Sequence, residues 1–346
     1  MPESRLTINF LDCGKSLANV EQQIERMSER VAITGGAGFI GSHLADGFLK
    51  AGYLVRIVDN LTTGSLDNLR QIRNRVDFQE LDIRDMRSLE EAFREVSIVL
   101  HHAGISSVPR SFDDLTCTHE VNVTGTLNVL NAAARAGVRR VINASSSAVY
   151  GNDGSEFQIE SAVPSPLSPY ALSKWMGELY AELFAKTTQL GTLSVRYFNV
   201  FGPRQSLATN YAAVIPLFIR KVAEGDSPTI FGDGEQTRDF TFVADVVEAI
   251  LRATGSEIPS GAVLNVATGT SLSLNELVRL LSEIFRTQKA AVYGPARRAD
   301  IRHSRANIAR SKRFLGNYAL TDFRDGLVQT ARWFLESSGR KQICES

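Results

Sequence analysis

The chain has 346 residues, a length that predicts either one large domain or two intimate ones with a sizeable core. Its 38 Lys and Arg residues are balanced by 38 Asp and Glu residues, so the net charge gives no reason to expect nucleic acid or an anionic membrane as a partner. The three cysteines lack the spacing of a zinc site or a disulfide framework, and in the absence of a signal peptide or a bilayer-spanning apolar run we expect a cytoplasmic protein.

The first predicted element is a helix in residues 16–30. Ser16 is a suitable N-cap, and apolar residues recur after it at helical spacing: Leu17, Val20, Ile24 and Met27. We expect this N-terminal extension, residues 1–30, to pack on the domain that follows it or at a subunit contact.

A glycine-rich turn follows a short apolar strand at residues 31–33. Gly35, Gly38 and Gly41 occur at three-residue spacing, and a predicted helix continues through residues 44–49. In this pattern the first glycine allows a tight strand-to-helix turn, the second lets a pyrophosphate approach the backbone, and the third lets the helix pack close to the strand. The helix N-terminus adds unpaired N–H groups for the phosphates, so the segment predicts a dinucleotide-binding unit.

The second strand, residues 53–58, ends in Asp59, which lies 18 residues after Gly41. An acidic side chain at this place holds the ribose hydroxyls of NAD and repels the 2′-phosphate of NADP. The polar loop of residues 60–65 is then in position to wrap the adenosine. We therefore predict NAD rather than NADP as the cofactor.

Strands and helices continue to alternate after this unit. We expect strands at residues 76–82, 98–104, 141–147, 193–198 and 263–267, and helices at 88–96, 120–136 and 170–186. The alternation predicts an α/β fold of the Rossmann type, a doubly wound parallel sheet of about seven strands with ligands at the carboxyl ends. Since His101 and His102 are adjacent in a strand and point to opposite faces, we interpret them as structural and predict no metal site.

The pattern loosens from residue 199 onward. The expected elements are a helix from about residue 212, a strand and turn at 229–234, and a helix with a capping box formed by Ser273 and Glu276. We predict a dinucleotide-binding domain made of residues 31–198 and about 238–268. A smaller C-terminal α/β domain for the substrate is predicted in about 199–237 and 269–337.

Tyr170 and Lys174 lie four residues apart at the head of a predicted helix, so both side chains can reach one site. A lysine ammonium beside a phenol favours the phenolate and lowers its pKa towards neutrality. Such a phenolate is a general base suited to deprotonating an alcohol while a hydride leaves the same carbon. One of the three hydroxyls that end the preceding strand, Ser145, Ser146 or Ser147, is predicted to hold the reacting oxygen.

Longer motifs surround these residues. They are Thr-Gly-Gly-Ala-Gly-Phe-Ile-Gly at 34–41, Ser-Ser-Ser-Ala-Val-Tyr-Gly at 145–151, Ser-Pro-Tyr-Ala-Leu-Ser-Lys at 168–174 and Arg-Tyr-Phe-Asn-Val-Phe-Gly at 196–202. With them the chain resembles the extended short-chain dehydrogenase/reductases of the NAD-dependent epimerase/dehydratase family, from about residue 31 to 334. Within that family it is most similar to nucleotide-sugar 4-epimerases, and among these to the UDP-N-acetylglucosamine 4-epimerases.

The resemblance implies that Tyr170 takes the proton of the sugar 4-hydroxyl, that NAD+ takes the C4 hydride, and that Ser146 and its neighbours hold O4. The 4-keto sugar then turns and receives the hydride on its other face, so NAD stays bound. NAD would be held by Gly35, Gly38, Phe39, Ile40, Gly41, Asp59, Asn60, Thr62, Gly64, Asp82, Ile83, Ala103, Gly104, Asn122, Tyr170, Lys174 and Tyr197. The UDP-sugar would be held by Ser107, Ser146, Asn199, Ala213, Val214, Arg238, Arg297, Asp300 and Ser304.

The resemblance also bears on the reaction and the sugar. Dehydratases of the family carry an Asp-Glu pair where this chain has Ser147 and Ala148, and decarboxylases use a Glu there, so both reactions are disfavoured. Ser304 stands where the family borders the C2 substituent, and a small residue implies room for an N-acetyl group. Arg238 and Arg297 have the charge for a diphosphate, although their sequence context fits solvated surface arginines equally.

Two alternatives remain at this point. The serine run also resembles uronate epimerases, so the protein is alternatively a UDP-hexuronate or UDP-N-acetylhexosaminuronate 4-epimerase. From another class, a non-catalytic NAD-sensing module is possible, although it need not keep serine, tyrosine and lysine together. Whichever sugar is used, the resemblance implies a homodimer through a four-helix bundle made by the helices at 120–136 and 170–186 of each subunit.

Overall fold

The computed structural model describes residues 29–152, 154–206, 213–296, 301–318 and 320–339. The helix predicted in residues 16–30 lies outside these ranges except at its end, and so do Arg297 and Asp300. None of the helices within the described ranges combines the length and the apolar character that a membrane span requires.

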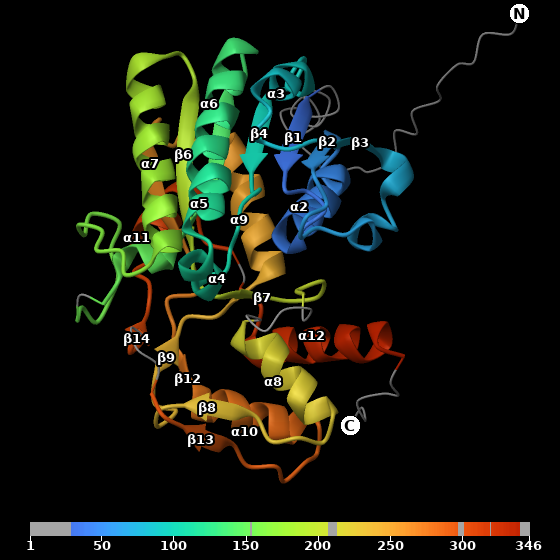
Figure 1. The fold of residues 1–346 in the computed structure, drawn as a ribbon, viewed down its shortest axis with the longest axis vertical. Helices are drawn as coiled ribbons and strands as arrows, with labels where there is room; N and C mark the ends of the chain where they lie inside the picture. Colours follow the sequence, from blue (N-terminus) through green and yellow to red (C-terminus); the bar gives the residue numbers. More distant parts are fainter. Residues whose placement is uncertain (1–28, 153, 207–212, 297–300, 319, 340–346) are drawn as a thin grey trace, which may run out of the picture.

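A seven-stranded parallel sheet forms the larger lobe (Figure 1). Its strands are β1 (Arg30–Thr34), β2 (Leu54–Asp59), β3 (Val76–Glu80), β4 (Ile98–His101), β5 (Arg140–Ser146), β6 (Gly191–Tyr197) and β11 (Ala262–Val266). Their spatial order is β11-β6-β5-β4-β1-β2-β3, so the winding reverses between β1 and β4. This confirms the predicted doubly wound fold and places its switch point, where such folds bind ligands, at the carboxyl ends of β1 and β4.

Helices cover both faces of this sheet (Figure 1). One face carries α2 (Phe39–Lys50), α9 (Val243–Gly255) and α11 (Ala309–Leu315), and the other carries α3 (Met86–Ala92), α6 (Gly125–Arg135) and α7 (Pro169–Thr187). Side chains of β1 alternate between the two resulting cores, with Val31 and Ile33 in the first and Ala32 in the second. Because the strand is buried on both sides, its sequence is a continuous apolar run.

The helices before the active-site strand differ in detail from the prediction. The helix expected at 120–136 begins as α5 (Leu115–His119), passes through a π-helical turn at Glu120–Thr124 and continues as α6. The helix expected at 88–96 is α3, which begins earlier because the Asp85 carboxylate caps it by accepting from the N–H groups of Arg87 and Ser88. Short helices that we did not predict are α4 (Val108–Asp113), η1 (Leu66–Leu69), η2 (Arg73–Arg75) and η4 (Ser147–Tyr150).

The smaller lobe has its own apolar core between α8 (Val214–Ala223), α10 (Leu274–Ile284) and α12 (Phe323–Ser337). Its short strands are β7 (Val200–Phe201) with β10 (Thr241–Phe242), β8 (Thr229–Phe231) with β13 (Val292–Gly294), and β9 (Thr237–Arg238) between β12 (Leu272–Ser273) and β14 (His303–Ser304). The capping box of Ser273 and Glu276 is confirmed at the head of α10. Arg238 pairs with Ser304 in this lobe, and the chain next contacts the larger lobe with α9, which packs on α2.

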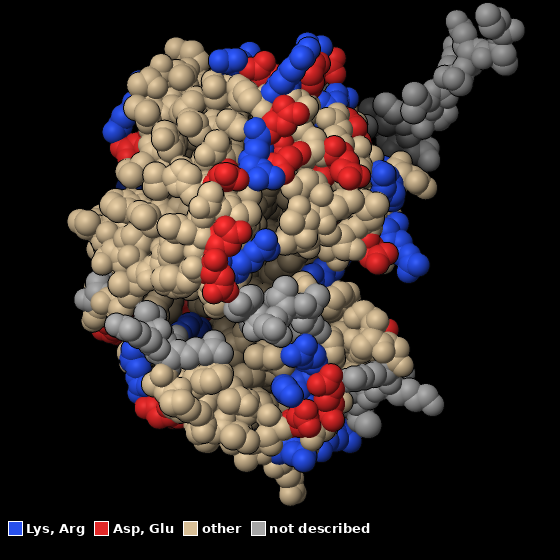
Figure 2. All heavy atoms as spheres, viewed as in Figure 1, with Lys and Arg blue, Asp and Glu red and all other residues tan. Residues whose placement is uncertain are grey.

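Charged side chains are interspersed over both lobes on the face shown in Figure 2. Lys and Arg alternate there with Asp and Glu, and no broad region of a single sign is visible on that face.

Candidate active site and dinucleotide site

The glycine-rich turn lies directly against the end of β4. Gly35 has a φ of 70°, and its N–H donates to the Val58 carbonyl at 2.8 Å. A Cβ atom at Gly35 would stand 2.6 Å from the backbone nitrogen of Ala103, and one at Gly41 would stand 2.1 Å from the Gly35 carbonyl oxygen. A side chain at either place would therefore collide with backbone, which explains why both positions are glycine.

The N-terminus of α2 is left open to a ligand. Gly38 is its N-cap in an extended conformation, and no side chain accepts from the first N–H groups. The first turn begins with Phe39 and Ile40 and contains no acidic residue. An uncapped helix N-terminus with no acidic residue in its first turn suits the pyrophosphate of a dinucleotide.

Asp59 is anchored beside this turn. Its Oδ2 accepts from the Ala37 N–H at 2.9 Å, and its Oδ1 accepts from the Leu61 N–H at 2.8 Å. Burial raises the pKa of the carboxyl group, while these two N–H donors lower it. A Cβ atom at Gly64 would approach Oδ1 to 2.8 Å, so the absent side chain keeps the carboxylate accessible from that direction. Each oxygen retains a lone pair for a ribose hydroxyl.

The residues after Asp59 form a hydrogen-bonded rim. Asn60 donates through Nδ2 to Asp82 Oδ2 at 2.9 Å and accepts from the Thr62 N–H at 3.1 Å. The Arg84 guanidinium lowers the pKa of the Asp82 carboxyl to about 2, so this carboxylate stays charged. Ile83, the next residue, is buried against Gly125 of α6. The structure thus places Asn60 and Asp82, both predicted to bind NAD, in contact with each other beside Asp59.

The head of α7 places Tyr170 and Lys174 beside the end of β5. Ser168 caps the helix, and the Tyr170 N–H donates to Ser111 Oγ at 3.1 Å. The pKa of the Tyr170 phenol is raised by burial, only partly offset by a hydrogen bond with the Ser146 side chain, and not lowered as the sequence predicted. Lys174 Nζ donates to the Ala144 carbonyl at 3.0 Å, and burial lowers the pKa of this ammonium to about 8. A lysine with this pKa can share a proton with its surroundings near neutral pH.

The three serines at the end of β5 have different environments. Ser145 is buried and donates to the Glu178 carboxylate in the interior. Ser146, the N-cap of η4, interacts with Tyr170, and Ser147 is the first residue of η4. This placement favours Ser146 as the hydroxyl that faces a ligand, because adjacent strand residues point to opposite faces.

Asn122 braces the loop that follows β4. Its Oδ1 accepts from the Ile105 N–H at 2.8 Å, and its Nδ2 donates to the Ile105 carbonyl at 2.9 Å and to Ser173 Oγ at 3.0 Å. A Cβ atom at Gly104 would lie 3.3 Å from Lys174 Nζ, so the missing side chain leaves space beside the lysine. Asn122 lies in the π-helical turn, and such turns are frequent at functional sites. Sequence reasoning missed Ser111 and Ser173, because their contacts with Tyr170 and Asn122 join segments that are distant in the chain.

The two strand histidines have separate partners. His101 is buried between Thr34 and Thr126, at 2.7 and 2.9 Å, and burial holds its pKa well below the usual value. His102 Nε2 lies 2.8 Å from the hydroxyl of Tyr197, and burial lowers the His102 pKa to about 3. Within the described ranges no three His, Cys, Asp or Glu residues form a group that could hold a metal ion.

The candidate substrate residues lie mainly at the junction with the smaller lobe. Asn199, with a φ of 33°, donates through Nδ2 to the Asp239 carbonyl at 3.0 Å. Arg238 is paired in register with Ser304 of β14, and Ser304 is buried. The other described candidates are Ser107, the N-cap of α4, Ala213, the N-cap of α8, and Val214, its first residue.

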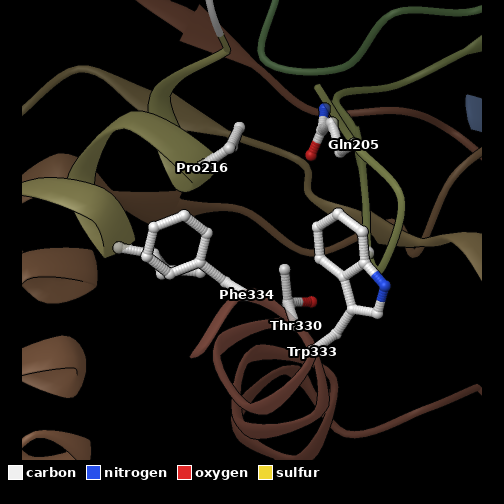
Figure 3. A pocket seen from close by; sticks show the side chains of 7 residues that line it. Gln205, Pro216, Thr330, Trp333 and Phe334 are labelled. Carbon is white, nitrogen blue, oxygen red and sulfur yellow. The ribbon is translucent and has the colours of Figure 1, made fainter. Parts of the chain in front are cut away.

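A small hollow lies inside the second lobe, between α8, α12 and the turn at 202–205 (Figure 3). Gln205, Pro216 and Trp333 are among its lining residues, and its volume is about 10 Å³. This volume accommodates about one water molecule, so the hollow is not a nucleotide site. The predicted catalytic residues are not among those that line it.

A model of the NAD dependent epimerase/dehydratase family matches residues 31–267. A curated relative from Methanocaldococcus jannaschii, described as a putative UDP-glucose 4-epimerase, is 36% identical over 88% of this chain and 97% of its own length. A UDP-glucuronate 4-epimerase from Thermodesulfobacterium geofontis is 31% identical over 88% of this chain and 96% of its own length. One similar solved structure is the UDP-N-acetylglucosamine 4-epimerase of Methanobrevibacter ruminantium in complex with UDP-N-acetylmuramic acid. It is 35% identical to this chain with a TM-score of 0.85, and the match covers 90% of this chain and 99% of that chain.

These matches agree with the site geometry. The open helix N-terminus at Gly38, the close approach of backbone at Gly35 and Gly41, and the anchored carboxylate of Asp59 all fit a dinucleotide. The family model spans more than half of the sequence, including every one of these residues. The chain therefore belongs to the NAD dependent epimerase/dehydratase family, and its cofactor is NAD.

Proposed function

We propose that this protein is a 4-epimerase of UDP-sugars with tightly bound NAD, and that it interconverts UDP-N-acetylglucosamine and UDP-N-acetylgalactosamine. The observation that carries the proposal is the meeting of Tyr170, Lys174 and Ser146 at the end of β5. These groups lie in the lobe whose glycine turn and Asp59 fit NAD. An acid–base residue beside a dinucleotide site is suited to oxidising and then reducing an alcohol.

The chain's own residues handle the proton and orient the sugar. When bound, NAD would supply the acceptor for the C4 hydride and, in its reduced form, the donor that returns it. Tyr170, as the phenolate, takes the proton from O4 and returns it after the sugar has turned, while the Ser146 hydroxyl keeps O4 in reach. We assign to Lys174, whose ammonium donates to the Ala144 carbonyl at the end of β5, the role of favouring the ionised form of the phenol. Because oxidation and reduction occur on the same substrate, no net redox change results.

The proposed preference for acetylated sugars rests on Ser304. Its side chain is small, it lies at a buried position, and it pairs across the sheet with Arg238, which we assign to the diphosphate. The solved relative from Methanobrevibacter ruminantium is itself a UDP-N-acetylglucosamine 4-epimerase. We further assign Asn199, Ser107, Ala213 and Val214 to the substrate, together with Arg297 and Asp300, which lie outside the described residues.

UDP-glucuronate is the competing substrate, because a relative at 31% identity is a UDP-glucuronate 4-epimerase. Incubating the protein separately with UDP-N-acetylglucosamine, UDP-glucose and UDP-glucuronate, followed by product analysis, distinguishes the three. We expect epimerisation at the highest kcat/KM with the acetylated sugar. If UDP-glucuronate is turned over fastest, the protein is the alternative UDP-hexuronate 4-epimerase. If none of the three sugars is turned over, the NAD-sensing module is the function that remains.

The cofactor is expected to copurify with the protein. Denaturing the purified enzyme should release NAD and no NADP, because Asp59 occupies the ribose side and the reaction cycle restores NAD at its end. The measurement is chromatographic identification of the released nucleotide. Asp59→Asn serves as the comparison, since it keeps the shape and removes the charge that repels a 2′-phosphate, and it should admit NADP. Recovery of NADP from the unmodified protein would contradict the assignment.

An exposed apolar stripe on α7 supports the proposed homodimer. Leu172, Leu179 and Leu183 are 44%, 48% and 50% exposed and recur at heptad-like spacing on one side of the helix. We propose that this stripe packs on a second copy in a four-helix bundle with the α5–α6 helix. Light scattering at micromolar concentration should give twice the monomer mass.

The dimer has a matched pair of variants. Leu179→Glu together with Leu183→Glu should give a monomer, because the charges would be desolvated in the bundle. Leu54→Glu is the control, since Leu54 is 47% exposed at the start of β2, away from α7. A monomeric unmodified protein, or a stripe variant that remains dimeric, would rule out this interface.

A further inference from the structure

The contact between α7 and the sheet contains a layer of polar side chains. Thr192 Oγ1 donates to the Ala181 carbonyl of α7 at 2.7 Å, and Asn143 Nδ2 donates to Ser194 Oγ at 3.3 Å. All three side chains are buried. The neighbouring helices have polar contacts with the sheet as well, from Arg56 to the Ala92 carbonyl of α3 and between His101 and Thr126 of α6. Hydrogen bonds in such an interior specify one arrangement of the two elements, because a displaced helix would leave them unpaired.

The same layer contains a buried ion pair between α7 and β6. Arg196 donates from Nε to Glu178 Oε1 at 2.9 Å and from Nη2 to Oε2 at 2.7 Å, and the two side chains are 3% and 5% exposed. Ser145 adds a third hydrogen bond to the same carboxylate. The guanidinium also lies 4.6 Å from the centre of the Tyr150 ring, so η4 is held as well. We call Ser145, Glu178 and Arg196 the α7 clamp.

The α7 clamp joins the two elements that form the proposed catalytic site. Glu178 lies on α7, four residues after Lys174 and eight after Tyr170, which is about 12 Å along the helix axis. Ser145 lies on β5 directly before Ser146, and Arg196 lies on the adjacent strand β6. A buried ion pair contributes little net stability compared with apolar packing, but its geometry is demanding. The presence of the ion pair at this place therefore points to a role other than stability.

We propose that the α7 clamp positions α7 against β5, so that Tyr170 meets Ser146 and Lys174 meets the Ala144 carbonyl. The inference rests on the proposed function of that site. None of the three clamp residues needs to touch substrate or cofactor; they are positioning residues that act through Tyr170. Loosening the clamp should therefore lower kcat and leave the KM for the UDP-sugar nearly unchanged, because the nucleotide is bound elsewhere.

The first test compares two buried substitutions under the same helix. Glu178→Gln keeps the shape and breaks the ion pair, and we expect kcat to fall on the order of 10-fold or more, since a misplacement of about 1 Å can cost 10²-fold. Thr192→Val is the control, because it removes a buried hydrogen bond to α7 outside the clamp. Both variants should lower the melting temperature, but only Glu178→Gln should lower kcat per folded enzyme.

A double variant separates positioning from stability. Replacing both charges, as in Glu178→Met with Arg196→Met, should recover melting temperature relative to Glu178→Met alone, since no unpaired charge remains buried. We expect its kcat to stay low, because the directional bonds are still missing. Recovery of kcat together with stability would show a merely structural role and overturn the proposal. If the charge variants do not fold, Ser145→Ala provides the test, because it leaves the ion pair intact and removes only the serine hydrogen bond. A normal kcat in Ser145→Ala would also count against the α7 clamp.

A spectroscopic readout needs no turnover. Burial raises the pKa of the Tyr170 phenol and the contact with Ser146 lowers it, so a clamp that sets both should, when loosened, shift the pH at which Tyr170 ionises. The measurement is the ultraviolet phenolate titration of each protein minus that of its Tyr170→Phe counterpart. An unchanged titration in Glu178→Gln would contradict the proposal. If the unmodified protein epimerises no UDP-sugar, the proposed function fails instead, and this titration still reports on the clamp.

Discussion

Replacing Tyr170 with phenylalanine is expected to lower kcat by roughly 10²-fold or more while the fold survives. Phenylalanine keeps the ring, and the Tyr170 N–H that donates to Ser111 belongs to the backbone, so the head of α7 should remain in place. Only the phenol hydroxyl is lost. That hydroxyl is buried and interacts with Ser146, where the proton of O4 must be taken up and returned.

Tyr180 offers a matched control on the same helix. It packs against the apolar core beneath α7 and lies away from β5's carboxyl end, so Tyr180→Phe should leave kcat unchanged. The measurement is steady-state epimerisation of both variants at saturating substrate, with circular dichroism to verify folding. Near-normal turnover in Tyr170→Phe would show that another group is the base.

Replacing Ser304 with tyrosine is expected to damage the acetylated substrates selectively. Ser304 is 5% exposed in β14 and is paired with Arg238 of β9, so a large side chain has little room at this position. Filling a fitted space typically costs about 1–3 kcal/mol, which corresponds to a loss of roughly 5- to 150-fold in kcat/KM. UDP-glucose and UDP-galactose lack the acetamido group and should lose much less.

The discriminating quantity is the ratio of kcat/KM between the two sugar pairs in each variant. Ser304→Ala is the control, because it keeps the position small and should preserve the ratio. The melting temperature of Ser304→Tyr identifies any general destabilisation, which would lower both pairs together. An equal loss on both pairs, or no loss on either, would remove Ser304 from the C2 pocket.

The dinucleotide half of the fold could be predicted from the sequence because its determinants are local. Gly35 and Gly41 must be glycine for reasons that involve the turn itself and its immediate neighbours, and Asp59 follows at the end of the next strand. Most of the seven strands were predictable because they are largely apolar and buried on both faces, whereas the edge strand β3 alternates apolar with polar residues. The capping box of α10 is likewise a contact between residues three apart.

What the sequence did not reveal depends on contacts between distant segments. The role of Ser111 requires α4 to meet α7, and the Glu178–Arg196 pair requires α7 to lie across β6. The three consecutive serines show the same limit. Alternation along a strand implies that Ser145 and Ser146 face opposite ways, but only the placement of α7 shows which of them meets Glu178 and which meets Tyr170.

The measurement that tests the central claim most directly follows the hydrogen at C4. UDP-N-acetylglucosamine labelled with deuterium at C4 is incubated with the purified protein in ordinary water, and the products are analysed by mass and by NMR. We predict UDP-N-acetylgalactosamine that retains the deuterium at C4, because the label passes to bound NAD and back without exchange while Tyr170 handles only the O4 proton. Product that has lost the label to water, or an absence of any C4-inverted product, would contradict this account.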